Sequence, residues 1–102
     1  MAVVMRFVQR FRADKRKEFM DLEREFARLE HGGVLTLGQR MAPLAARDPG
    51  NTLIWESTFQ DLAAAEQALK ALEQSEQHQR LLEKQIAFFE DAWVEFYEVL
   101  DF

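Results

Sequence analysis

The chain has 102 residues, no cysteine and a net charge of −5, from 13 basic and 18 acidic residues. The length predicts one domain spanning residues 1–102, and the lack of cysteine excludes disulfides, thiolate metal sites and thiol nucleophiles. The negative charge disfavours nucleic acid as a partner, because phosphate contacts dominate such binding. No apolar run approaches the roughly 20 residues of a membrane helix, and the start MAVVMRFVQRF lacks the apolar core of a signal peptide. We therefore expect a cytoplasmic protein with no membrane partner.

Residues 2–11 are predicted to form a strand, because apolar and other residues alternate along them. One face of this strand carries Val3, Met5, Phe7 and Phe11, and the other carries Val4, Arg6, Val8 and Arg10. Asp14 is a candidate N-cap for a following helix. The apolar stripe of that helix is Phe19, Leu22, Phe26 and Leu29. The helix is expected to end at His31-Gly32-Gly33, because glycine adopts the left-handed C-cap conformation at little cost.

The middle of the chain predicts two strands joined by a turn. Val34 to Met41 is expected to be the second strand, and Pro43 ends it. The run Asp48-Pro49-Gly50-Asn51 reverses the chain, because proline presets one turn residue and glycine permits a positive φ at the next. Thr52 to Phe59 is expected to be the third strand.

The last part of the chain predicts a helix with an interruption and a closing strand. Asp61 is expected to cap a helix whose apolar face contains Leu62, Ala65, Leu69 and Leu72. That stripe loses phase near residues 74–77, where Ser75 is a plausible new N-cap. Ala92 to Leu100 has the β-forming residues of a fourth strand.

The element order β-α-β-β-α-β predicts an α+β protein. Right-handed crossovers from the first strand to the second and from the third to the fourth give a four-stranded antiparallel sheet in the order 4-1-3-2. Both helices then lie on one face, which is the ferredoxin-like arrangement. The opposite face would be half apolar, so we expect a second copy to cover it and form a homodimer. The candidate dimer interface is Val4, Arg6, Val8, Arg10 and Glu56. Glu56 would then need a cation, for which Arg6, Arg10 and Arg40 are the candidates.

This element order and the run LIWESTFQDLAAAEQALKAL resemble the dimeric α/β-barrel superfamily, which includes antibiotic biosynthesis monooxygenases and the NIPSNAP-like, EthD-like and haem-degrading proteins. LIWES followed by LAAAEQAL, SEQHQRLLEK and EFYEVL is most similar to the NIPSNAP-like branch. The acid-proline-acid-tryptophan run common in that branch is replaced here by Ser75-Glu76-Gln77-His78. The resemblance implies a dimeric α/β barrel, and it implies little about function because this fold hosts many functions.

The candidate site lies between sheet and helices, where proteins of this superfamily hold their substrates. Phe7, Gln9, Phe26 and Trp55 are the candidate pocket residues. Trp55 is interpreted first as core packing and second as a pocket wall. Gln9 interrupts an apolar face and needs a partner if it is buried. Haem degradation is not expected, because Leu82 stands where that branch has its histidine ligand.

No motif identifies a reaction. His31 and His78 are interpreted as a helix-terminal and a solvated surface residue, so no metal and no cofactor is expected. Three functions therefore stay open. The first is a homodimer that binds a small hydrophobic or aromatic ligand without established chemistry. The second is a cofactor-independent monooxygenase acting on an electron-rich aromatic substrate, in which the protein supplies a dry pocket and orientation. The third is a structural or regulatory assembly module without a ligand.

Overall fold

The computed structural model describes all residues 1–102 and contains one four-stranded antiparallel sheet. Its strands are β1 (Val3–Phe11), β2 (Gln39–Met41), β3 (Thr52–Phe59) and β4 (Phe89–Glu98). Their order across the sheet is β2-β3-β1-β4, which confirms the order predicted from the sequence. The fold is therefore α+β and ferredoxin-like.

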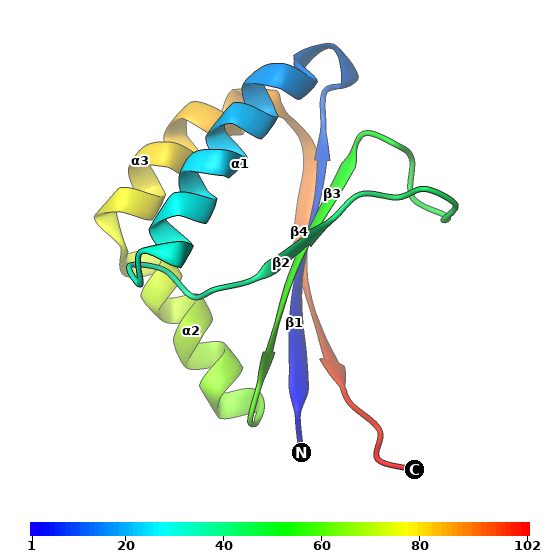
Figure 1. Ribbon diagram of the computed structural model, residues 1–102, viewed down its shortest axis with the longest axis vertical. Coiled ribbons are helices and arrows are strands. Elements are labelled where there is room, and N and C mark those ends of the chain that lie inside the picture. Colours follow the sequence, from blue (N-terminus) through cyan, green and yellow to red (C-terminus); the bar gives the residue numbers. More distant parts are fainter.

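Three helices, α1 (Arg16–His31), α2 (Leu62–Gln74) and α3 (Glu76–Gln85), lie on one side of this sheet and leave the other side bare (Figure 1). Two short 3-10 turns, η1 (Ala13–Lys15) and η2 (Ile86–Phe88), lead into α1 and β4. The predicted interruption of the second helical region is confirmed. Ser75 has extended backbone between α2 and α3, and its hydroxyl accepts the backbone N–H of His78 at 3.3 Å. Asp61 caps α2 in the same way, accepting the N–H of Ala64 at 2.8 Å.

The N-cap predicted at Asp14 is wrong. Asp14 lies inside η1, and α1 begins after Lys15, whose side chain makes no capping hydrogen bond. The Asp14 carboxylate instead accepts a hydrogen bond from Arg12 at 3.3 Å. The other end of α1 agrees with expectation, because Gly33 takes a positive φ of 79° just after the helix.

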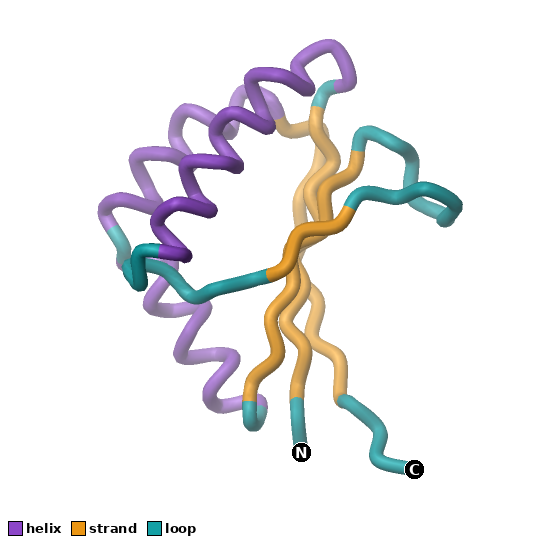
Figure 2. The backbone as a smooth tube through the Cα atoms, in the orientation of Figure 1, coloured by secondary structure: helices purple, strands orange, loops and turns teal.

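The second strand is shorter than predicted, because residues 34–38 leave the sheet and cross toward α1 (Figure 2). The backbone N–H of Gly38 donates to the side chain of Glu30 at 3.1 Å instead of joining the sheet. A Cβ at Gly38 would overlap the indole of Trp55, so the close approach of this segment to the tryptophan requires glycine. The fourth strand is also displaced, since it begins at Phe89 rather than at the expected Ala92.

The register assigns each strand residue to a face of the sheet. Phe7 pairs with Trp55 on one side and with Val94 on the other, and this row faces the helices. Arg6 pairs with Glu56 and Glu95, and this row faces away from them. The core on the helix side is formed by two separate clusters of buried residues. One cluster is Val3, Met5, Trp55 and Ala65, and the other is Phe11, Phe19 and Leu53.

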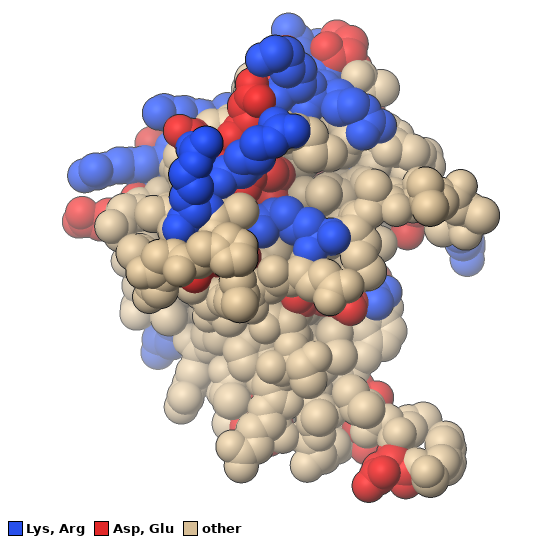
Figure 3. Space-filling model, viewed as in Figure 1, with Lys and Arg blue, Asp and Glu red and all other residues tan.

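Only 14 of the 102 residues are buried. Large apolar side chains remain exposed on β4 and after it, including Val94, Phe96, Tyr97 and Leu100. None of the helices is both long enough and apolar enough to cross a membrane. Charges are concentrated elsewhere, since Figure 3 shows Lys and Arg side chains gathered around α1 while the lower half of that view is largely uncharged.

Candidate ligand-binding cavity

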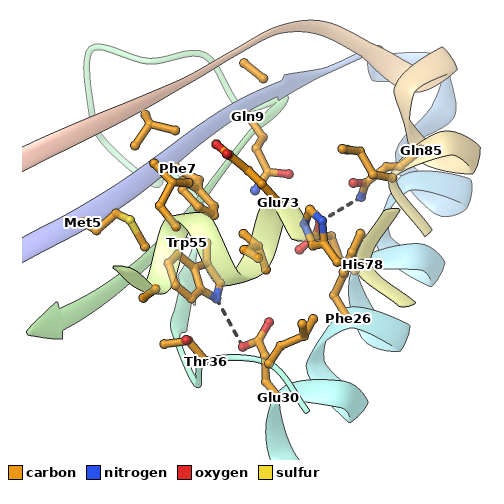
Figure 4. Close-up of a pocket in the computed structure, with 18 of the residues that line it drawn as sticks. Met5, Phe7, Gln9, Phe26, Glu30, Thr36, Trp55, Glu73, His78 and Gln85 are labelled. Atoms are coloured by element: carbon orange, nitrogen blue, oxygen red, sulfur yellow. Dashed lines mark hydrogen bonds between the residues drawn. The ribbon is translucent and has the colours of Figure 1, made fainter. Parts of the chain in front are cut away.

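A cavity of about 270 Å³ lies between the sheet and the three helices (Figure 4). Its walls are mainly hydrophobic, with 13 apolar residues among the 22 that line it. The four candidate pocket residues named from the sequence, Phe7, Gln9, Phe26 and Trp55, all lie along this wall. They come from β1, α1 and β3, so the fold brings together residues that are far apart in the chain.

Trp55 belongs to the core and to the cavity wall at once. Its side chain is 5% exposed, and its indole stacks on Phe7 with ring centroids 4.9 Å apart and an interplanar angle of 22°. Such stacked pairs contribute about 0.5–1.5 kcal/mol beyond the area that they bury. The indole Nε1 donates to Glu30 Oε1 at 3.2 Å, so its one polar group is satisfied. Trp55 therefore presents an apolar ring face to the cavity.

Behind this wall, Arg40 of β2 joins two buried carboxylates of α1. Its Nε donates to Glu23 Oε2 at 2.8 Å, and Nη1 and Nη2 donate to the two oxygens of Glu30 at 3.1 and 2.6 Å. Bidentate pairs of this kind are among the strongest hydrogen bonds in proteins. Burial lowers the pKa of Arg40, but its hydrogen bonds to Glu30 and Glu23 outweigh that effect and the pKa is raised overall. Arg40, one of the three cations expected as a partner for Glu56, does not pair with it, because Glu56 pairs with Arg6.

The remaining oxygen of Glu23 is also occupied. Gln85 of α3 is 1% exposed, and its Nε2 donates to Glu23 Oε1 at 2.8 Å. Glu30 Oε1 accepts from Gly38, Arg40 and Trp55 together. All four oxygens of the two buried carboxylates therefore accept hydrogen bonds. Arg40 balances only one of the two negative charges, so this part of the wall offers no free cation to a ligand and keeps a net negative charge.

Gln9 contrasts with these satisfied groups. It projects from β1 toward the cavity and is only 9% exposed (Figure 4). Its side-chain amide makes no hydrogen bond to any other group of the protein, in contrast to Gln85 and Gln79, whose amides both donate. The polar atoms of Gln9 are not sealed inside the protein as His78 Nδ1 is, so they reach the open space of the cavity. The amide is a polar group on the sheet side of the cavity that has no partner in the chain.

His78 was interpreted from the sequence as a solvated surface residue, and that interpretation is wrong. It is half-buried, lines the cavity from α3, and lies against Phe26 with ring centroids 5.2 Å apart. Its Nδ1 is buried without a hydrogen-bond partner. Burial lowers the pKa of His78 below the ordinary value of 6.5, so the ring is neutral near pH 7. The spacing from His78 to Leu82 and Gln85, four and seven residues, places all three on one helical face and could have revealed its orientation.

The outer face of the sheet carries the five candidate interface residues. These are Val4, Arg6, Val8, Arg10 and Glu56. Arg6 pairs with Glu56 at 2.8 Å, and its guanidinium lies 5.1 Å from the centroid of the Tyr97 ring. Val8 is only 3% exposed, because Ile54 and Trp93 flank it in the same row.

Glu95 organises the β4 side of this outer face. It accepts hydrogen bonds from Tyr97 and Trp93 at 2.7 and 2.9 Å. These two bonds lower the pKa of Glu95. The bond between Tyr97 and Glu95 also raises the pKa of Tyr97. The outer face is thus an ordered mixture of charge pairs and apolar side chains. His31 is exposed at the end of α1, and the chain has no cluster of three His, Asp or Glu side chains suited to a metal ion.

Comparison with solved structures identifies the class of fold. A NIPSNAP family protein from Agrobacterium tumefaciens superposes with a TM-score of 0.79 and 17% identity, covering 99% of this chain and 88% of that one. A NIPSNAP domain protein from Burkholderia xenovorans gives 0.78 and 18%, covering 100% and 97%. A putative antibiotic biosynthesis monooxygenase from Nitrosomonas europaea gives 0.65 and 12%, covering 97% and 90%.

The chain thus has the ferredoxin-like fold shared by NIPSNAP and antibiotic biosynthesis monooxygenase proteins, as the sequence resemblance implied. No protein-family model and no curated protein matches it. At these identities the similarity establishes the fold alone. Function must be argued from the cavity and from the bare face of the sheet.

Proposed function

We propose that residues 1–102 form one domain of a cytoplasmic homodimer that binds a small hydrophobic or aromatic molecule in the cavity between sheet and helices. Phe7, Gln9, Phe26 and Trp55 would contact the ligand. The single observation that carries this proposal is the free amide of Gln9 inside a mostly apolar cavity. A cavity that served only as imperfect packing would be expected to stay apolar, whereas an amide that the chain leaves unpaired and open to the cavity is available to a ligand.

The dimer part of the proposal rests on the bare face of the sheet. Helices cover only one side, and the other side exposes apolar groups beside the Arg6–Glu56 pair. A second copy placed sheet against sheet would cover Val4 and the exposed ring of Tyr97 beside it, and it would add apolar contact to this face. The two proposed roles are separable, since the cavity and the outer face lie on opposite sides of the sheet.

Native mass spectrometry of the purified protein tests both roles at once. We expect twice the mass of the chain, together with extra mass that is lost on denaturation. Ala92→Leu places a larger side chain on the cavity wall, and it should weaken ligand retention. Ala87→Leu is the matched control, because Ala87 is also exposed and does not line the cavity. Equal ligand retention by wild type, Ala92→Leu and Ala87→Leu would place the ligand elsewhere.

A second function, cofactor-independent oxygenation of an electron-rich aromatic substrate, is favoured by one observation. His78 presents a half-buried imidazole at the cavity, and the lowered pKa keeps it neutral and able to accept a proton. A hydroquinone could lose its hydroxyl proton to such a base before it reacts with O₂. One oxygen atom would enter the ring and the other would leave as water, with the hydroquinone itself supplying the electrons, so that the product is a hydroxyquinone. Oxygen uptake with hydroquinones, abolished in His78→Phe, is the expected result, and binding without oxygen uptake would leave the first proposal standing alone.

The cavity argues against the third possibility, an assembly module without a ligand, since such a module has no use for an apolar cavity into which an unpaired amide opens. Its signature would be a dimer that carries no extra mass and whose thermal stability no small aromatic compound changes.

A further inference from the structure

If the cavity binds a ligand as proposed above, the chemical class of that ligand follows from the polar group that the chain leaves without a partner. The Gln9 amide holds an acceptor, Oε1, and a donor, Nε2–H, side by side in one plane. Gln9 is more than nine-tenths buried and its amide bonds to nothing in the chain. The complementary ligand group carries a donor and an acceptor on neighbouring atoms, because only such a group satisfies both halves of the amide together.

The charge state of the ligand follows from the rest of the wall. Arg40 is fully used by Glu23 and Glu30, so it offers no free cation to an anionic ligand. The exposed carboxylate of Glu73 at the rim adds negative potential near the cavity. An anion entering this cavity would lose its hydration without gaining an ion pair, which is costly in an apolar site. These features disfavour an anionic ligand, whereas a neutral molecule can enter without needing an ion pair.

The shape of the ligand follows from the aromatic walls. The Phe7–Trp55 stack forms part of the sheet-side wall, and the Phe26–His78 pair forms part of the helix-side wall. Both pairs face the cavity in Figure 4. Aromatic rings stack favourably in offset or tilted arrangements on such walls. The volume of about 270 Å³ is near the lower end of typical ligand pockets, roughly 300–1,000 Å³, so one or two fused rings would fill it.

We propose that the cavity binds a neutral, planar aromatic molecule that carries a hydrogen-bond donor and acceptor on neighbouring atoms, as in a cyclic amide, and that Gln9 pairs with both. This assigns Gln9 a specificity-determining role. The Phe7–Trp55 wall gives apolar contact to any flat ring, whatever polar groups the ring carries. The amide of Gln9 then selects the ligands whose polar groups match it.

The test uses 2-quinolone, a neutral fused-ring cyclic amide, and N-methyl-2-quinolone, which has the same ring and carbonyl but no N–H. Titration calorimetry of the wild-type protein should show that 2-quinolone binds about tenfold tighter, or more, than N-methyl-2-quinolone. A tenfold difference in affinity corresponds to the contribution of about one buried hydrogen bond. Quinoline-2-carboxylate, an anion of similar size, should bind more weakly than either.

Two variants separate Gln9 from general effects on the cavity. Gln9→Met keeps the side-chain length and removes both polar atoms, so it should bring 2-quinolone down to the affinity of the N-methyl compound. Gln79→Met is the matched control, because Gln79 lines the same cavity but its Nε2 already donates to the Glu73 carbonyl at 3.0 Å. It should preserve the preference for 2-quinolone.

The outcomes distinguish this inference from the proposal on which it rests. If the wild type binds both quinolones equally, the cavity is a small-molecule site and the proposed pairing with Gln9 is wrong. Tighter binding of the carboxylate would likewise overturn the selection of neutral ligands. If no compound binds and the purified protein retains no ligand mass, both the proposed ligand class and the proposed binding function are wrong. The comparison of the three compounds uses the wild-type protein, so it stands even if Gln9→Met fails to fold.

Discussion

Arg40 and Glu30 form a two-point pair, with Nη1 and Nη2 of the guanidinium 3.1 and 2.6 Å from the two carboxylate oxygens. The pair ties β2, a strand of only three residues, to the last turn of α1. Glu30 also receives the indole N–H of Trp55, so the same carboxylate fixes the wall of the cavity. The position of Trp55 therefore depends on charges that lie behind it rather than on apolar packing alone.

Removing the Arg40 guanidinium should destabilise the protein strongly. Arg40→Met leaves the buried carboxylates of Glu23 and Glu30 without a cation, and the expected loss in the free energy of unfolding is about 3–5 kcal/mol. Arg40→Lys should recover only part of it, because an ammonium cannot reproduce the planar, three-nitrogen contact. Chemical denaturation measures both. Arg24→Met is the control, since water screens the exposed Arg24–Asp21 pair and its loss should change the free energy of unfolding little. Similar losses for Arg40→Met and Arg24→Met would contradict this role.

Gly38→Ala should disturb the wall through Trp55. The added methyl would overlap the indole, so either residues 34–38 or the ring must move. We expect a loss of about 1–3 kcal/mol, typical of overpacking, together with altered Trp55 fluorescence. The fluorescence is best followed in a Trp93→Phe background, which leaves Trp55 as the only tryptophan. Gly50→Ala is the control, because nothing lies within 4 Å of a Cβ at Gly50. An unchanged fluorescence spectrum in Gly38→Ala would show that residues 34–38 can move away without disturbing Trp55.

The sequence predicts the sheet order because hydrophobic alternation and the right-handed crossover rule are strong local and topological signals. It overstates the second strand because the decisive interaction is not local. Val34 to Met41 has the composition of a strand, yet the N–H of Gly38 bonds to the Glu30 side chain eight residues earlier. No pattern within the strand itself shows that a carboxylate will take this donor.

The candidate site shows the same division between apolar and polar groups. Phe7, Phe26 and Trp55 follow from periodicity, which places large apolar residues on the covered face. Glu23 and Glu30 were missed because buried carboxylates contradict the usual distribution of charge. Their positions, four residues after Phe19 and Phe26, lie on the buried face of α1, and this spacing is the signal that could have found them.

Placing a charge on the outer face of the sheet should dissociate the proposed dimer. Val4→Glu introduces a carboxylate that would be buried between two sheets without a partner, and the dimer dissociation constant should rise by about 100-fold or more. Leu44→Glu is the control, because Leu44 is fully exposed in the loop between β2 and β3. Sedimentation velocity at micromolar concentration measures the change. A wild-type protein that sediments as a monomer at that concentration would falsify the sheet-to-sheet dimer itself.

His78 should make stability depend on pH. Burial lowers its pKa in the folded protein below the ordinary value of 6.5, so the unfolded chain binds a proton first as the pH falls. The free energy of unfolding should therefore be unaffected by this group above about pH 6.5 and should decline as the pH falls from there toward the folded-state pKa. Chemical denaturation between about pH 7.5 and pH 5 should show a flatter decline for His78→Gln than for the wild type.

The comparison isolates His78 because every other charged group of the cavity stays in place. These groups are Glu23, Glu30, Arg40 and Glu73, and their contributions are common to both proteins. His31→Gln is the matched control, because it removes the other histidine, which is exposed at the end of α1, and it should keep the wild-type slope. If His78→Gln declines as steeply as the wild type, the imidazole takes up its proton as readily in the folded protein as in the unfolded chain, and its proposed use as a neutral base in the cavity fails with it.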